Sequence, residues 1–335
     1  MKKKIINCAI IGLGIGERHL ETLISTNNIK IMGLCDFNSR KIQSIKNNYR
    51  IKNQLRDCLF TKDYKDILNI KNLDFVVISS YDNFHCDQII EFAKKKINIF
   101  VEKPLCQNKK EFLKIKKIAV KKKIFIGCNF VLRENPIFKK LKKEIKKGIF
   151  GKIYHTESEY NYGRIEKIHS GWRGKIPFYS VNQGGSIHLL DIIFFIKKFK
   201  INKIFSLGNN INSINSRFKY PDLCVSLLKF EDGSTSKITS NFSCVTPHHH
   251  KLSIFGTKKT FEYNYLNNIY YSSRDKQKTT IKISKNIKKY NKSNILKKFV
   301  NNLKNNKSNI LKKDMEGLFY ITEIILKLDE SMNQN

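Results

Sequence analysis

A glycine-containing turn near the start of the chain limits which folds are open to it. The apolar run IINCAIIG (residues 5–12) leads into Gly12 and Gly14, and leucines at helical spacing follow at once. Glycine adopts backbone conformations that other residues avoid, and a strand that turns directly into a helix needs this freedom. The pattern predicts the first strand and helix of a doubly wound α/β domain, where free N–H groups at the helix start can hold a phosphate.

The third glycine of this loop is out of register with a dinucleotide fingerprint. The pattern requires glycine at position 17, but Glu17 stands there and Gly16 comes one residue early. The third glycine normally lets the helix pack closely against the sheet. The loop is therefore compatible with a bound dinucleotide, and also with a scaffold that no longer binds one.

Asp36 favours the dinucleotide hypothesis. It ends the next apolar run, 24 residues after Gly12, where an acidic residue binds the adenosine ribose hydroxyls and disfavours a 2′-phosphate. We therefore expect NAD as the cofactor. Arg40 leaves NADP open, although a solvated helix charge explains it equally well. The residues expected to bind the adenosine and phosphates are Gly12, Gly14, Gly16, Asp36 and Arg40.

Strand-like and helical segments alternate through the first part of the chain, which is typical of a parallel sheet. The expected strands are 5–12, 29–36, 74–80, 97–104 and 124–130, and the expected helices are 18–26, 40–48, 86–96 and 109–122. Helices follow at 136–148 and 186–199, with a long strand at 151–163 and antiparallel strands from 201 to 265. We predict an α/β Rossmann domain over 1–130 and an α+β substrate-binding and oligomerisation domain with a mainly antiparallel open sheet over 131–335.

The composition excludes several classes of protein. The net charge is +36, but the lysines are spread over nearly every predicted helix beside abundant Asn and Ile, as A/T-rich codon usage would produce. A nucleic-acid-binding protein would concentrate its charge on one face, so we expect no specific nucleic-acid partner. No apolar run approaches the roughly 18 residues of a membrane span. Eight scattered cysteines without a CxxC pair indicate reduced thiols and a cytoplasmic location.

The segment YDNFHCDQIIEFAKKKINIFVEKPL (81–105) resembles the centre of the glucose–fructose oxidoreductase/inositol dehydrogenase (Gfo/Idh/MocA) family. The matching motifs are Asn83-x-His85 after one strand and Glu102-Lys103-Pro104 at the end of the next. Residues 129–153 and 255–261 also resemble family segments, in order along the chain. The resemblance implies an NAD(P)-dependent dehydrogenase acting on a CH–OH group of a carbohydrate, assembled as a homodimer or homotetramer.

The resemblance also implies roles for individual residues. Lys103 would contact the substrate hydroxyl and the nicotinamide ribose, and Glu102 would orient this lysine or line the cofactor site. Ser80, Asn83 and His85 would lie beside the nicotinamide half, although His85 is also explained as a helix-capping histidine.

His188, three residues before Asp191, matches a family motif that makes it the catalytic base, because imidazole accepts a proton near neutral pH. A core histidine is the alternative. Many members carry an aspartate one helical turn earlier, and this chain has Gly184 there, so the partner of His188 stays open. Asp191 is one candidate. The residues expected to contact substrate are Tyr160, Trp172, Arg173, Gln183 and Asp191.

Three adjacent histidines at 248–250 do not predict a metal site, because neighbouring residues on a strand face opposite ways. The predicted activity is hydride transfer between nicotinamide and a hydroxyl or keto carbon of a sugar, sugar nucleotide or cyclitol, with surface-polysaccharide sugars as one setting. Three alternatives stay open: a non-enzymatic dinucleotide sensor, a polyanion-binding module, and a variant that uses bound NAD transiently to cleave glycosides.

Overall fold

The computed structural model describes residues 5–48, 51–264, 266–275, 284–285 and 290–334. The chain divides into two compact units: unit 1 comprises residues 1–129 and 293–322, and unit 2 comprises 130–292 and 323–335. Every helix among the described residues is too short or too polar to span a bilayer.

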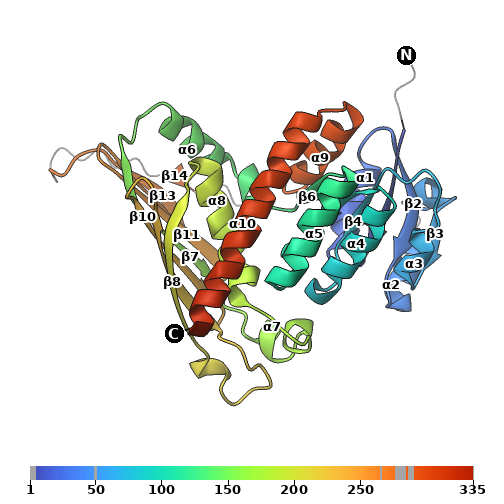
Figure 1. Cartoon of the computed structure of the whole chain (residues 1–335), viewed down its shortest axis with the longest axis horizontal. Helices are drawn as coiled ribbons and strands as arrows, with labels where there is room; N and C mark the ends of the chain where they lie inside the picture. Colours follow the sequence, from blue (N-terminus) through green and yellow to red (C-terminus); the bar gives the residue numbers. More distant parts are fainter. Residues whose placement is uncertain (1–4, 49–50, 265, 276–283, 286–289, 335) are drawn as a thin grey trace. The chain divides into compact units, whose positions relative to one another are not determined.

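Unit 1 is built on a parallel six-stranded sheet with the strand order β3-β2-β1-β4-β5-β6 (Figure 1). The strands are β1 (Ile6–Ile11), β2 (Ile29–Cys35), β3 (Leu59–Thr61), β4 (Phe75–Ile78), β5 (Asn98–Val101) and β6 (Ile126–Cys128). The Rossmann prediction is confirmed, with one strand more than expected. β3 was missed because it has only three residues and none of them is buried.

The helices of unit 1 that precede residue 130 are α1 (Gly16–Ile24), α2 (Ser39–Lys46), the short α3 (Tyr64–Ile67), α4 (His85–Lys94) and α5 (Lys109–Lys122). A side chain accepts from a first-turn N–H group at the start of α2, α3 and α5, but not at the start of α1 or α4. At the start of α5, the Asn108 side chain accepts from the Glu111 N–H at 2.9 Å, and Glu111 accepts from the Gln107 N–H at 2.8 Å. Such reciprocal capping explains why this helix has the predicted bounds.

Two C-terminal helices, α9 (Asn294–Lys304) and α10 (Ser308–Gln334), change the predicted division of the chain. The ring of Phe299 on α9 lies 6.1 Å from Phe75 and 5.5 Å from Phe100, both buried in the sheet of unit 1. A Cβ on Gly127 would lie 2.6 Å from the same ring. Residues 293–322 therefore belong to unit 1, and not to the second domain as expected, because α9 completes the apolar core of the first.

Unit 2 contains a mixed eight-stranded sheet with the order β14-β13-β12-β11-β7-β10-β9-β8 (Figure 1). The strands are β7 (Ile153–Asn161), β8 (Ile201–Asn209), β9 (Leu223–Phe230), β10 (Thr235–Asn241), β11 (His249–Gly256), β12 (Thr260–Tyr263), β13 (Asn267–Tyr271) and β14 (Ser284–Lys285). All neighbouring strands are antiparallel except β7 and β10. The predicted α+β class is confirmed.

The helices of unit 2 include α6 (Pro136–Lys146), α7 (Glu166–His169) and α8 (Ile187–Ile196). A single π-helical turn, Asn182–Ser186, leads directly into α8. The sequence of α8 is apolar almost throughout, and the helix packs against both α6 and β7. One face of the sheet is thereby covered, and the site residues of unit 2 lie at this covered face.

The contact of α9 with the first sheet predicts a specific loss of stability. Replacing Phe299 with alanine removes a buried ring that touches two others, and we expect it to lower the free energy of unfolding by about 3–5 kcal/mol. Urea denaturation of the full chain measures this. Leu113→Ala, at an exposed position of α5, is the control and should change stability by less than about 0.5 kcal/mol. Equal stability of the two variants would contradict this packing.

Candidate active site

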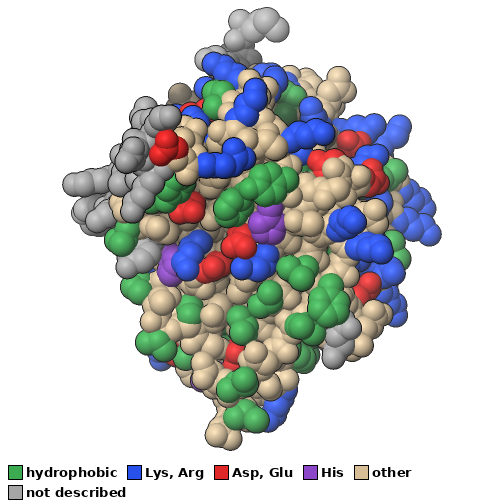
Figure 2. Space-filling view, turned by 90° about the vertical axis from the view of Figure 1, so that its left-hand side faces the viewer, with side chains coloured by type: hydrophobic (Ala, Val, Ile, Leu, Met, Phe, Trp, Pro, Cys, Tyr) green, Lys and Arg blue, Asp and Glu red, His purple; other side chains and the backbone are tan. Residues whose placement is uncertain are grey.

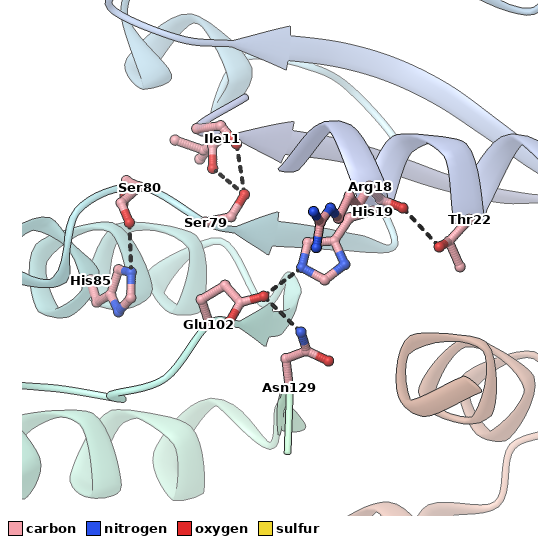
Figure 3. Close-up of polar contacts among 10 residues, drawn as sticks. Ile11, Arg18, His19, Thr22, Ser79, Ser80, His85, Glu102 and Asn129 are labelled. Carbon is pink, nitrogen blue, oxygen red and sulfur yellow. Dashed lines mark hydrogen bonds and ion pairs between the residues drawn. The ribbon is translucent and has the colours of Figure 1, made fainter. Parts of the chain in front are cut away.

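The glycine loop lies directly on the end of β4. Gly12 has φ +85°, and a Cβ there would overlap the backbone of Ser79. The Ser79 hydroxyl donates to the Gly12 carbonyl at 2.7 Å (Figure 3 shows its approach to Ile11). Only glycine fits this position, and the contact with Ser79 fixes the backbone conformation of the loop there.

Gly16 performs the packing role expected of the third glycine. It is the first residue of α1, and a Cβ on it would lie 2.6 Å from Ser79 Oγ and 3.1 Å from Ile10 Cγ2. Glu17 is exposed. A Cβ on Gly14 would meet only Lys41 Nζ, at 3.5 Å, and no side chain caps α1. The shifted fingerprint thus keeps an open cradle of N–H groups that suits a pyrophosphate.

Asp36 holds this cradle in place. It is buried, and its carboxylate accepts from the Leu13 N–H at 2.7 Å and from the Asn38 N–H at 2.8 Å. Lys41 Nζ lies 3.6 Å from the same carboxylate, whereas Arg40 is exposed. Lys41 therefore stands nearer the predicted phosphate site than Arg40 does. The sequence alone did not single it out, because lysines are so frequent in this chain.

Glu102, at the end of β5, sits in a polar network that Figure 3 shows. Its Oε1 lies 2.7 Å from His19 Nε2 on α1 and accepts from the Asn129 amide at 2.8 Å. Burial raises the pKa of Glu102, but the bonds to His19 and Asn129 and the charge of Lys103 outweigh it, and the pKa lies below its ordinary value. The carboxylate beside Lys103 is therefore ionised and fixed in direction. The sequence analysis did not identify His19 as part of the site.

His85 has a different place from the one expected. It is fully buried, and its ring nitrogens face the carbonyl oxygens of Pro104, at 2.7 Å, and Ser80, at 3.2 Å. The ring therefore ties the loop after β4 to the loop after β5 and is not available to a cofactor. The Ser80 hydroxyl donates to Gln88 at 2.7 Å. Asn83, in the short turn before α4, is half-buried.

In unit 2, an aromatic cluster forms around Tyr160 on β7. The Tyr160 ring lies 5.9 Å from His188, nearly parallel to it at 15°, and 5.7 Å from Tyr162. His248 and His250 contact the same ring at 5.1 and 5.0 Å. His188 is half-buried in the first turn of α8. The imidazole of His188 therefore packs against the ring of Tyr160, which the other rings of the cluster hold in place.

Burial, followed by the charges of His248, Lys292 and His249, lowers the pKa of His250 to about 3. The His250 imidazole is therefore neutral near pH 7. Among the described residues, no group of three His, Cys, Asp or Glu side chains has an arrangement that could hold a metal ion.

Arg173 and Tyr179 occupy the space beside Gly184. A Cβ on Gly184 would overlap the Tyr179 hydroxyl, which accepts from Arg173 Nε at 3.1 Å. The Arg173 guanidinium lies 4.6 Å from the centre of the Trp172 ring. The aspartate expected at position 184 from the resemblance has no room here, because a tyrosine held by an arginine fills its place.

Gln183 does not face a substrate as we expected. It is buried, and its amide donates to Asp329 on α10 at 2.9 Å. Ser180 and Asn182 donate to the same carboxylate at 2.6 and 2.9 Å. Burial raises the pKa of Asp329, although these three bonds oppose the shift. The network fixes the π-helical turn that leads into α8, the helix that carries His188.

Asp191 likewise differs from the expectation that it contacts substrate. Its buried carboxylate accepts three hydrogen bonds from the Arg133 guanidinium, at 3.0, 3.0 and 2.5 Å. A bidentate ion pair of this kind fixes α8 to the segment at the start of unit 2. Of the catalytic candidates, Lys103 belongs to unit 1 and His188 to unit 2.

The Glu102 network predicts a pH-dependent contribution to stability. Because the folded-state pKa lies below the ordinary value of 4.5, the contribution is present above the unfolded-state pKa and is lost as pH falls through the folded one. Glu102→Gln should cost about 1–3 kcal/mol at pH 7, and the difference from wild type should shrink below pH 4.5. Urea denaturation at several pH values measures it. Exposed Glu21→Gln serves as the control, and a Glu102 effect independent of pH would refute the assignment.

Comparisons with known proteins agree with this geometry. Residues 6–130 match the model of the oxidoreductase family with an NAD-binding Rossmann fold, and residues 138–262 match the GFO/IDH/MocA C-terminal domain. The oxidoreductase YrbE of Bacillus subtilis is 26% identical over 77% of this chain and 73% of its own length. The myo-inositol 2-dehydrogenase of Thermotoga maritima is 23% identical over 74% of this chain and 72% of its own.

Solved structures show the same fold. Levoglucosan dehydrogenase in complex with NADH and levoglucosan superposes with a TM-score of 0.81 at 14% identity, covering 99% of this chain and 98% of that one. The scyllo-inositol dehydrogenase of Lactobacillus casei, with bound NAD(H) and scyllo-inositol, gives 0.75 at 17% identity over the same shares. The predictions of an NAD cofactor and of an oxidoreductase are confirmed. The chain belongs to the Gfo/Idh/MocA family of NAD-dependent oxidoreductases.

Proposed function

We propose that the chain transfers a hydride between NAD and a hydroxyl-bearing or keto carbon of a sugar, sugar nucleotide or cyclitol. The observation that carries this proposal is the position of Lys103, next to the fixed Glu102 carboxylate at the end of β5. Ligands of such sheets bind beyond the carboxyl ends of the strands, where the glycine loop also lies. The relatives and solved structures named above include two inositol dehydrogenases.

Residues of both units have roles in the proposed reaction. N–H groups of the loop at Gly12 and Gly14 hold the pyrophosphate, and Asp36 holds the adenosine ribose. The bound nicotinamide supplies the hydride acceptor or donor. Lys103 stabilises the negative charge that develops on the substrate oxygen, and His188 takes up or returns the hydroxyl proton. We further place this activity in the cytoplasm, in line with eight free cysteines, and include surface-polysaccharide sugars among the substrates to assay.

Removal of either proton-handling group should abolish most turnover. Lys103→Ala and His188→Ala should each lower kcat/KM by on the order of a hundredfold or more, because each loses an interaction that is strongest in the transition state. NADH fluorescence titration should show near-unchanged binding in His188→Ala, because, of the two residues, only Lys103 is expected to contact the nicotinamide ribose. Exposed Lys110→Ala on α5 is the matched control for charge. Unchanged kcat/KM in Lys103→Ala would contradict the proposed role.

The same assay separates the alternatives. Tight NADH binding without turnover of any carbohydrate in a broad panel would favour a sensor. Release of a free sugar without net formation of NADH would favour the glycoside-cleaving variant.

The preference for NAD over NADP should depend on Asp36. Its carboxylate repels a 2′-phosphate, so Asp36→Asn should raise the NADP-to-NAD ratio of kcat/KM by roughly tenfold or more, about 1.4 kcal/mol. Lys41→Ala should weaken whatever NADP use exists, because Lys41 Nζ lies beside Gly14. Arg40→Ala, at an exposed position, should change little. Equal wild-type rates with the two cofactors would contradict the role of Asp36.

We also propose that the face of the unit 2 sheet opposite α8 joins two copies of the chain. Phe205, Leu207 and Leu227 on β8 and β9 are 45–50% exposed on this face. Along the sheet they are followed by the ion pairs Lys237–Glu157 and Lys251–Glu159. Figure 2 shows apolar and charged side chains side by side on this side of the molecule. Such a surface suits a self-complementary interface.

Substitution on this face should dissociate the assembly. Leu227→Lys places a charge at the centre of the apolar strip, so sedimentation should show a shift from dimer or tetramer towards monomer. Ile211→Lys, 73% exposed in the short turn after β8, is the control. A wild-type chain that sediments as a monomer at micromolar concentration would refute the interface.

A further inference from the structure

Two arginines lie beside the aromatic cluster that holds His188. The chain has nine arginines against 55 lysines. The A/T-rich codon usage that explains the many lysines therefore does not explain these two arginines. Arg164 and Arg173 are nine residues apart in the segment that follows β7. The Arg164 guanidinium lies 5.5 Å from the centre of the Tyr162 ring, and that of Arg173 lies 4.6 Å from Trp172.

A hydrogen bond holds the Arg173 guanidinium in position. Arg173 donates from Nε to the Tyr179 hydroxyl at 3.1 Å, and the Tyr179 ring is buried 6.0 Å from Phe242. Arg164 is exposed, and no ion pair joins it to an acidic residue within the described part of the chain. A planar guanidinium stacked on an aromatic ring loses little freedom when it binds an anion.

Two of these charges lie near a ring that contacts His188. Burial raises the pKa of Tyr160, and the charges of Arg173 and Arg164 oppose this shift. The Tyr160 ring stacks on His188. Burial lowers the pKa of His250, which lies 5.0 Å from the same tyrosine, and the charge of Lys292 adds to this shift.

Three acidic residues of the neighbouring elements have partners outside the cluster. Glu159, the neighbour of Tyr160, pairs with Lys251 at 2.9 Å on the other face of the sheet. Asp191 is bound by Arg133, and Asp329 by the side chains of the π-helical turn. These three carboxylates are therefore held away from the cluster around His188.

We propose that the substrate carries an anionic group, a carboxylate or a phosphate, which Arg173 and Arg164 bind while the aromatic cluster contacts the sugar ring. This inference rests on the proposed function and narrows its substrate class to acidic or phosphorylated sugars. Guanidinium groups recognise both anions through paired N–H bonds. The aromatic faces of Tyr160 and Tyr162 offer apolar surface to the C–H groups of the ring.

The fluorescence of Trp172 provides a test that does not require turnover. Trp172 is the only tryptophan in the chain and lies under the Arg173 guanidinium, so an anion bound there should change its emission. The probes are D-glucose, D-glucuronate and D-glucose 6-phosphate, titrated into the full chain with NADH at constant ionic strength. The last two distinguish a carboxylate from a phosphate.

We expect saturable changes with at least one anionic probe, at a Kd on the order of 10- to 100-fold below that of glucose. Arg173→Gln and Arg164→Gln should each remove most of this difference. Arg274→Gln, exposed elsewhere in unit 2, should keep it. Equal affinity for glucose and both anions, or no response to any anion beyond that to KCl, would overturn the proposal.

The two proposals fail in different ways. Anion binding at Arg173 together with full turnover by Lys103→Ala would refute the catalytic assignment and leave the substrate class standing. Turnover of neutral sugars only, lost in Lys103→Ala, would refute the substrate class and leave the catalytic assignment standing.

Discussion

The close contact between the glycine loop and Ser79 is the constraint on which the first unit depends. Ser79 leaves no room for a Cβ at Gly12 or Gly16, and its hydroxyl fixes the carbonyl of Gly12. Asp36 fixes the next N–H of the loop, that of Leu13. A loop held from both sides keeps its free N–H groups directed at one point. The cradle therefore does not need glycine at position 17, because the close approach of helix and sheet occurs at Gly16.

The few acidic residues of this basic chain hold the site together. The chain has 28 acidic residues against 64 basic ones. Three of the buried acidic residues fix the position of segments that carry candidate site residues. Glu102 is bound by His19 and Asn129, Asp191 by Arg133, and Asp329 by the π-helical turn. A buried carboxylate is costly unless donors surround it. These acids therefore specify one arrangement of loops, while the excess lysines remain on the surface.

Local sequence patterns predicted most helices and strands, whereas contacts between residues far apart in the chain determine which unit an element belongs to. The predicted bounds of α5 match the structure, and the loop at Gly12 followed from its place after a strand. The three-residue β3 carries no apolar run that could be recognised. The grouping of α9 with unit 1 depends on Phe299 meeting Phe75 and Phe100, more than 190 residues away along the chain, which no local pattern contains.

Residue type alone also did not reveal where a side chain points. His85, Gln183 and Asp191 had suitable chemistry and position in the sequence, but all three are buried and bind neighbouring elements. Conversely, Tyr179 takes the space left by Gly184, which became visible only in three dimensions. The motif residues Gly12, Gly16, Asp36 and Glu102 stand at the ends of strands and at the start of α1 as expected, and their roles toward a cofactor stay predictions.

The central claim is that the shifted glycine loop presents NAD to Lys103. A crystal structure of the full chain with NADH tests it most directly. The account predicts the pyrophosphate on the N–H groups that follow Gly12, the adenosine ribose on Asp36, and the nicotinamide next to the Lys103 ammonium. A dinucleotide bound away from the loop, or a nicotinamide out of reach of Lys103, would contradict it.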